Sequence, residues 1–264
     1  MRRRIIPGHN VLTAENLERQ YRKFIGSEPA VTDFIAHDPV QFPRRYTRRA
    51  DIEIAAFLTA TIAWGRRDLI LRSTEKMFTL MEGKPAEFMR SSAWSKLNGD
   101  AMHQVNIHRT FFESDLKYFY KGFCHCYAKY GSLENLFAAG MKTDKIKPEI
   151  WQAIALFRQE MAAANGGRHS KHISNPGNSA CKRLNLALRW LIRPGPVDLG
   201  LWKKIKPAAL YLPLDVHVAR NSRRLGLLTR KSNDKKAVAE LTEKLRSFCP
   251  EDPVKYDFVL FRDQ

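Results

Sequence analysis

Two side chains of this sequence have types and surroundings suited to chemistry, the carboxylate of Asp215 and the amine of Lys182. Asp215 lies in Pro213–Arg220 (PLDVHVAR), where an apolar turn leads into a helix. A carboxylate there can stabilise the positive charge that develops on a sugar when an N-glycosidic bond breaks. An amine whose pKa is lowered by burial and by the like charge of Arg183 can attack the sugar carbon and hold it as a Schiff base.

Both residues also have an ordinary structural interpretation. An Asp between an apolar turn and a helix is often the helix N-cap, and Asp215 can serve both purposes. A lysine in a basic chain is more often solvated or in contact with a phosphate. His217, in the first turn of the same helix, is a phosphate contact, a pocket residue or a surface histidine with no special role.

The charge of the chain predicts an anionic partner. The sequence has 45 Lys and Arg against 27 Asp and Glu, a formal net charge of +18. Such a protein attracts polyanions, and nucleic acid is the most abundant of these in a cell. The basic residues are spread in pairs and triplets rather than gathered on one amphipathic helix, which favours nucleic acid over a membrane surface. No segment resembles a membrane span or a signal peptide, so a cytoplasmic location is expected.

The spacing of apolar residues predicts an all-α fold with no strand pair. Asp51–Trp64 is apolar on nearly all sides and should be a central buried helix ended by Gly65. Asp252 is predicted as an N-cap. The predicted helices are Val11–Ile25, Asp51–Trp64, Asp68–Met81, Ser114–Ala128, Ser132–Phe137, Pro148–Ala163, Ala180–Leu191, Val216–Leu225, Asp234–Arg246 and Pro253–Phe261.

Neither a metal nor a cofactor is predicted. The four cysteines are too scattered for a disulfide framework, and no partner pair stands at zinc spacing near Cys124-His125-Cys126, so free buried thiols are expected. His169 and His172 have no acidic or cysteine partner nearby, which favours phosphate contact over metal binding.

Two segments carry a family resemblance. Pro213–Arg220 resembles the Pro-x-Asp-x-x-Val-x-Arg element of the helix-hairpin-helix DNA glycosylase superfamily, in which the Asp is the catalytic carboxylate. Pro176–Lys182 (PGNSACK) resembles the hairpin of the lyase members, where a glycine-containing turn precedes a helix with a nucleophilic lysine. The long interval between Lys182 and Asp215 looks most like the archaeal 8-oxoguanine DNA glycosylase branch. Only Cys249 follows Asp215, so the four-cysteine iron–sulfur cluster of some members is not expected.

The whole chain is also similar to members of a bacterial family of unassigned function. The similar blocks are Ala50–Arg66, Ser179–Arg193 and Pro213–Leu225. The superfamily resemblance implies a single glycosylase-like unit over residues 1–264, built as two helical lobes with a cleft between them. Its hairpin would span residues 172–191 and its catalytic helix residues 215–225.

The resemblance implies a role for nine residues. Lys182 and Asp215 would be catalytic, and Trp64 would line the base pocket or fill the gap left by an extruded base, although it is equally consistent with plain core. A helix beginning near Ser179 would present free backbone N–H groups to a phosphate. The expected DNA contacts are Arg66, Arg67, Asn178, Ser179, Arg183 and His217.

The predicted function is base-excision repair. The protein would be a monomer in the cytoplasm, associated with the nucleoid, and would bind double-stranded DNA that contains a damaged base. It would flip that base, 8-oxoguanine being the example the resemblance implies, and remove it through a Schiff base on Lys182. The alternatives are a monofunctional glycosylase and a non-catalytic nucleic-acid-binding protein.

Overall fold

The fold is all-α, as predicted, apart from one short pair of strands. The computed structural model describes residues 14–97, 105–141 and 150–261, so the predicted helix starts at Val11 and Pro148 lie outside the described residues. With η for a 3-10 helix, the elements are α1 (Ala14–Ile25), α2 (Glu28–His37), η1 (Pro39–Gln41), η2 (Pro43–Arg45), α3 (Arg49–Thr61), α4 (Arg67–Thr79), α5 (Pro85–Arg90), η3 (Ala93–Lys96), β1 (Asn106–His108), β2 (Phe111–Phe112), α6 (Glu113–Tyr130), α7 (Leu133–Met141), α8 (Ile150–Ala163), α9 (Lys182–Ile192), η4 (Pro207–Ala209), α10 (Val216–Arg224), α11 (Lys235–Arg246), η5 (Pro253–Tyr256) and α12 (Asp257–Leu260).

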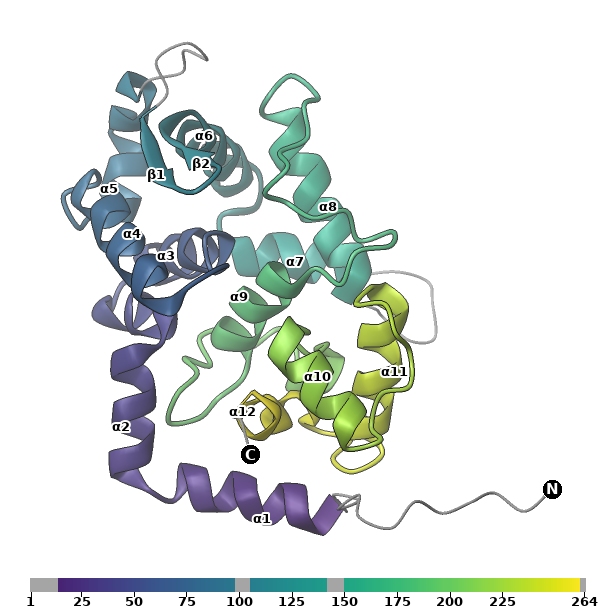
Figure 1. The fold of residues 1–264 in the computed structure, drawn as a ribbon. Coiled ribbons are helices and arrows are strands. Elements are labelled where there is room, and N and C mark those ends of the chain that lie inside the picture. Colours follow the sequence, from purple (N-terminus) through teal and green to yellow (C-terminus); the bar gives the residue numbers. More distant parts are fainter. Residues whose placement is uncertain (1–13, 98–104, 142–149, 262–264) are drawn as a thin grey trace, which may run out of the picture.

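The helices are arranged around the contact between α3 and α9 (Figure 1). On one side of it, α6, α7 and α8 pack together and α5 packs against α3. On the other side, α10 and α1 both pack against α12. The buried apolar residues of both sides belong to one continuous core. No helix in the described part of the chain is long and apolar enough to cross a membrane.

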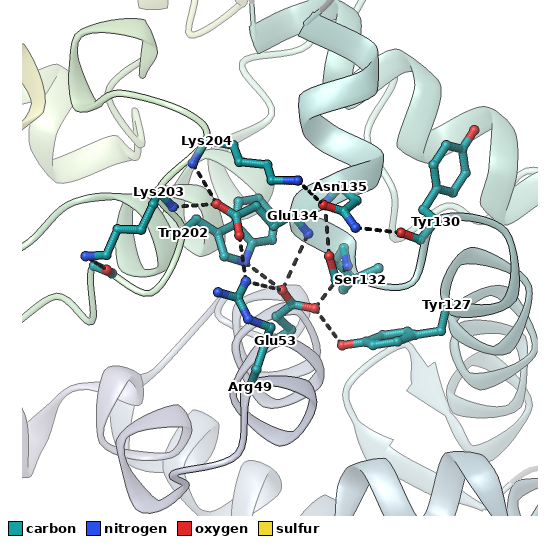
Figure 2. A network of polar contacts seen from close by, with 12 residues as sticks. Arg49, Glu53, Tyr127, Tyr130, Ser132, Glu134, Asn135, Trp202, Lys203 and Lys204 are labelled. Carbon is teal, nitrogen blue, oxygen red and sulfur yellow. Dashed lines mark hydrogen bonds and ion pairs between the residues drawn. The ribbon is translucent and has the colours of Figure 1, made fainter.

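The central helix α3 is buried as the sequence predicts. Every residue from Asp51 to Thr61 is buried. Among them is Glu53, whose carboxylate accepts hydrogen bonds from the Tyr127 hydroxyl at 2.6 Å and the Trp202 indole N–H at 2.9 Å (Figure 2). It also accepts the backbone N–H of Leu133, at 3.0 Å. Because a buried carboxylate is costly without partners, this network joins α3, α6, α7 and the segment after α9 in one arrangement.

The C-terminal end of α3 differs from the prediction. The helix ends at Thr61 rather than Trp64, and Gly65 adopts a φ of 94° four residues later. The last carbonyl groups of a helix have no partner within it. Here Thr61 O and Ala63 O accept hydrogen bonds from the side chains of Arg183 and Lys182. The end of α3 is therefore set by contacts with α9, which the local sequence does not show.

The predicted hairpin at residues 172–191 is helical only from Lys182 onwards. Residues 164–181 form turns and irregular chain between α8 and α9, and α9 begins three residues later than Ser179. Cys181 has a left-handed conformation, with a φ of 47°. That conformation is unfavourable for a residue with a side chain and breaks any helix before Lys182. A helix start near Ser179 is therefore wrong.

Four further details differ from the sequence-based predictions. The short helix α2 was missed because only Val31 of it is buried, which leaves no clear apolar periodicity. The strands β1 and β2 were missed because they contain only three and two residues. Asp252 does not cap η5, because its carboxylate accepts from Arg193 instead, at 2.8 Å. The cysteines are all free, but Cys124 and Cys249 are half-buried rather than buried.

Candidate functional site

A cavity of about 1190 Å³ lies where the N-terminal ends of α9 and α10 meet the loop after α3 and the short helix α12. Its lining residues come from the loop after α3, from α4 and α9, and from α10 and α12. The cavity is large enough to hold a nucleotide unit, since ordinary ligand pockets measure ~300–1,000 Å³. Its lining includes all nine residues to which the family resemblance assigns a role, namely Trp64, Arg66, Arg67, Asn178, Ser179, Lys182, Arg183, Asp215 and His217.

Lys182 is the first residue of α9 and is half-buried in the cavity wall. Its amine donates a hydrogen bond to the carbonyl of Ala63, at 2.9 Å. Burial lowers the pKa of the Lys182 amine, while the nearby carboxylates of Asp215, Asp257 and Asp38 act in the opposite direction. A lowered pKa increases the neutral, nucleophilic fraction of an amine at neutral pH. Burial therefore favours the neutral form of the Lys182 amine.

Asp215 is the N-cap of α10, which confirms its structural interpretation. One carboxylate oxygen, Oδ1, accepts the backbone N–H groups of His217 and Val218, both at 2.9 Å. The same side chain lines the cavity and is close enough to Lys182 to act on its pKa. The cap therefore fixes a negative charge beside the amine, and the structural role of Asp215 is compatible with a chemical one.

Arg183 and Trp64 form one packed unit at the edge of the cavity. The Arg183 guanidinium donates to Thr61 O at 2.8 Å and lies 4.9 Å from the centre of the Trp64 ring. Burial lowers the pKa of Arg183. The Trp64 ring stacks on His172 at 5.6 Å and meets His108 edge-on at 4.8 Å. Both side chains are thus held within the protein, and the Arg183 guanidinium already has a partner.

His172 is an interior residue, which corrects its interpretation as a phosphate contact. It is 5 % exposed. Its Nε2 lies 3.1 Å from Thr110 O and 3.4 Å from an oxygen of Asp115. The sequence could not show this, because the residues that bury His172 come from β2, α6 and the loop after α3.

Other basic side chains that line the cavity are more exposed. Arg66 is exposed and makes two hydrogen bonds to Asp68, at 3.1 and 2.8 Å. An exposed pair of this kind is weak in water, so Arg66 can exchange it for a phosphate. Arg67 lies 5.0 Å from the centre of the Phe261 ring, and the exposed His217 ring lies 6.3 Å from the same ring.

The turn before α9 is closed by its own hydrogen bonds. The N–H of Ser179 donates to Asn175 O at 3.1 Å, and the N–H of Cys181 donates to the Ser179 hydroxyl at 3.1 Å. The carbonyl of Asn178 accepts the N–H of Lys235 at 2.9 Å. These N–H groups are therefore engaged within the protein. The helix end that faces the cavity is that of Lys182, where no side chain caps α9.

The structure adds two carboxyl groups that the sequence analysis missed. Asp257, the first residue of α12, is buried in the cavity wall, and burial raises its pKa to about 7. Asp38 caps η1 through the N–H of Val40 at 3.0 Å, and burial raises its pKa too. One feature of the sequence could have indicated a buried carboxylate. Arg189 lies two turns after Lys182 among the apolar residues of α9, and a buried arginine needs an anionic partner.

The helical fold and the charged cavity do not by themselves identify an activity. Residues 38–264 match the model of a family described as a protein of unknown function (DUF2400). The chain belongs to that family, and the matched region includes the whole cavity except Phe34. A search of curated proteins and a search of solved structures each found no match.

Proposed function

We propose that this protein is a DNA glycosylase with abasic-site lyase activity. The observation that supports the proposal most is the Lys182 amine, which lies in the wall of a nucleotide-sized cavity with a lowered pKa and with the Asp215 carboxylate nearby. Each element of this arrangement serves cleavage of an N-glycosidic bond. The resemblance of Pro213–Arg220 and Pro176–Lys182 to the helix-hairpin-helix glycosylases points to the same chemistry.

The proposed reaction starts with the neutral Lys182 amine. It attacks the C1′ carbon of the flipped nucleotide, and the bond between C1′ and the base breaks with its electron pair on the base. The Asp215 carboxylate stabilises the positive charge that develops on the sugar. The lysine nitrogen then loses a proton, the ring oxygen gains one, and the C1′–O4′ bond opens to an iminium. A base then removes a proton from C2′ of this Schiff base, a C2′–C3′ double bond forms, and the C3′–O bond breaks with its electron pair on the departing 3′ phosphate, which cleaves the strand.

The charge of the protein supports a nucleic-acid partner. The formal net charge is +18. Arg66 and Arg67 stand at the rim of the cavity, next to the uncapped N-terminal end of α9. Backbone N–H groups at a helix N-terminus bind phosphate oxygens well. In the proposal, these groups hold the strand of double-stranded DNA while a damaged base, such as 8-oxoguanine, enters the cavity.

Borohydride trapping tests the proposal. The wild-type protein should form a covalent adduct with a duplex that contains 8-oxoguanine or an abasic site, and Lys182→Ala should form none. Lys206→Ala is the matched control, since this exposed lysine lies outside the cavity and its loss removes the same charge. Strand cleavage that persists in Lys182→Ala would refute the proposed mechanism.

A second candidate, a non-catalytic nucleic-acid-binding protein, is supported by the capping role of Asp215. The two hydrogen bonds at Oδ1 account for an Asp at this position without any chemistry. This candidate predicts salt-sensitive DNA binding that survives Asp215→Asn, with no adduct on any duplex. Base release without an adduct would instead indicate a monofunctional glycosylase.

A further inference from the structure

Asp257 is a buried carboxyl group with an unusual set of contacts. Its side chain lies in the wall of the cavity and is 7 % exposed. One oxygen, Oδ2, accepts a short hydrogen bond from the Arg189 guanidinium. The other, Oδ1, is buried and has no hydrogen-bond partner among the described residues. A buried carboxylate oxygen without a partner is costly, whereas a carboxylic acid in the same place is less so.

The charged groups around Asp257 act on its ionisation in opposite directions. Arg189 of α9 attracts its negative form, while the carboxylates of Asp215 and Asp198 oppose it. Asp198 is itself engaged by Arg189 at 3.2 Å and by Arg193 at 3.1 Å. Burial is the largest influence, and together these effects raise the pKa of Asp257 to about 7. The group therefore exchanges its proton in the physiological range.

Ionisable groups on the elements packed against α12 complete the surroundings. His217 of α10 approaches α12 at Phe261, and Arg67 lies against the same ring. Glu18 of α1 and Lys255 of η5 form an ion pair, with 2.7 Å between Lys255 Nζ and Glu18 Oε2. Lys182 and Asp38 line the same cavity, and the charges of Asp257 and Asp38 both raise the pKa of the Lys182 amine against the effect of burial.

We propose that Asp257 is a positioning residue that controls the charge of Lys182. The two groups line the same cavity, and the amine loses its proton more readily, and so becomes nucleophilic, when the Asp257 carboxyl group is protonated and neutral. No covalent bond between heavy atoms changes: the Asp257 carboxylate gains a proton and the Lys182 ammonium group loses one, each by exchange with solvent. The inference rests on the proposed function in taking Lys182 as the nucleophile.

Reductive labelling of Lys182 by formaldehyde and cyanoborohydride tests this without DNA. The extent of labelling is read by peptide mass spectrometry from about pH 5 to about pH 10, a range that covers both ionisations of a coupled pair. In the wild type, labelling should rise in two steps. Asp257→Asn carries no charge to hold the ammonium form, so labelling should rise in one step, displaced to lower pH by about one unit.

Two control variants identify the source of the shift. Asp252→Asn removes another carboxylate of the same arginine network, paired with Arg193, but Asp252 lies outside the cavity wall. His217→Asn removes the titratable ring nearest to α12. Both should keep the two-step profile. A profile of Asp257→Asn that superimposes on the wild type, or an equal shift in Asp252→Asn, would overturn the inference.

A reciprocal measurement covers the case in which Asp257→Asn does not fold. Two coupled groups shift each other's ionisation by the same free energy. Lys182→Met keeps the length of the side chain but removes its charge. In an infrared titration, the carboxylic acid band of Asp257 should then persist to higher pH than in the wild type. An unchanged band would overturn the inference. A shifted profile together with no DNA adduct would support the coupling while refuting the proposed function.

Discussion

Asp215 is expected to have two separable functions, capping of α10 and stabilisation of positive charge. Its Oδ1 accepts two backbone N–H groups at 2.9 Å. Loss of an N-cap acceptor costs ~1 kcal/mol, within a range of ~0.5–2 kcal/mol. Asp215→Ala should therefore lower the free energy of unfolding by about 1 kcal/mol, and the Tm by ~2–4 °C for a chain of this size. Asp215→Asn keeps an acceptor oxygen and should stay within about 0.5 kcal/mol of the wild type.

Catalysis should respond differently, because both substitutions remove the negative charge. Loss of a preorganised electrostatic group slows a reaction by roughly 10²–10³-fold. Borohydride trapping on an abasic duplex should therefore show a comparable loss of adduct formation in Asp215→Asn and Asp215→Ala, while urea denaturation separates their stabilities.

Ser132→Ala is the matched control for the cap. The Ser132 hydroxyl accepts the N–H of Asn135 at 3.1 Å and lies outside the cavity. This variant should lose about as much stability as Asp215→Ala, ~1 kcal/mol, and still form the adduct. Wild-type adduct formation by Asp215→Asn would refute a catalytic role for the carboxylate. If Asp215→Ala were as stable as the wild type, the value of ~1 kcal/mol for the contribution of the cap to the free energy of unfolding would be refuted.

Two further predictions concern Arg189 and Asp257, whose buried side chains line the cavity. Arg189→Met leaves Asp198 and Asp257 without their shared cation, so the free energy of unfolding at neutral pH should fall by ~3–5 kcal/mol in urea denaturation; a loss below about 1 kcal/mol would show that the pairing is not stabilising. Because the pKa of Asp257 is raised to about 7, the folded state binds this proton more tightly than the unfolded chain does. The resulting stability is complete below the unfolded pKa of ~4 and is lost as the pH rises through the folded pKa. Asp257→Asn should remove that dependence, and equal changes in urea midpoint between about pH 5 and about pH 7.5 in both proteins would contradict it.

Much of the local structure follows from the sequence. The positions of the long helices are readable because apolar residues recur at helical spacing, as in α6 and α8. The caps at Ser132 and Asp215 are readable too, since a short polar side chain just before a helix commonly accepts its first free N–H groups. Local signals failed where the pattern was short or mostly exposed, as in β1, β2 and α2.

The candidate site was only partly readable. Lys182 and Asp215 were found because their types and local sequence resemble a known pair of elements. Asp257 had no such local signal, because an acidic residue at the start of a helix is common and usually solvated. What distinguishes it is burial beside Arg189, which comes from a helix far away in the chain.

The sequence by itself determined the all-α class, the basic charge and the candidate pair of an amine and a carboxylate. These properties depend on composition and on short-range periodicity. Only the tertiary structure decided that Lys182 donates to Ala63 O, that Trp64 contacts both His172 and Arg183, and that Asp257 lies in the cavity wall. Burial and the distance between charges set the pKa of each group, and both depend on segments that are brought together only when the chain folds.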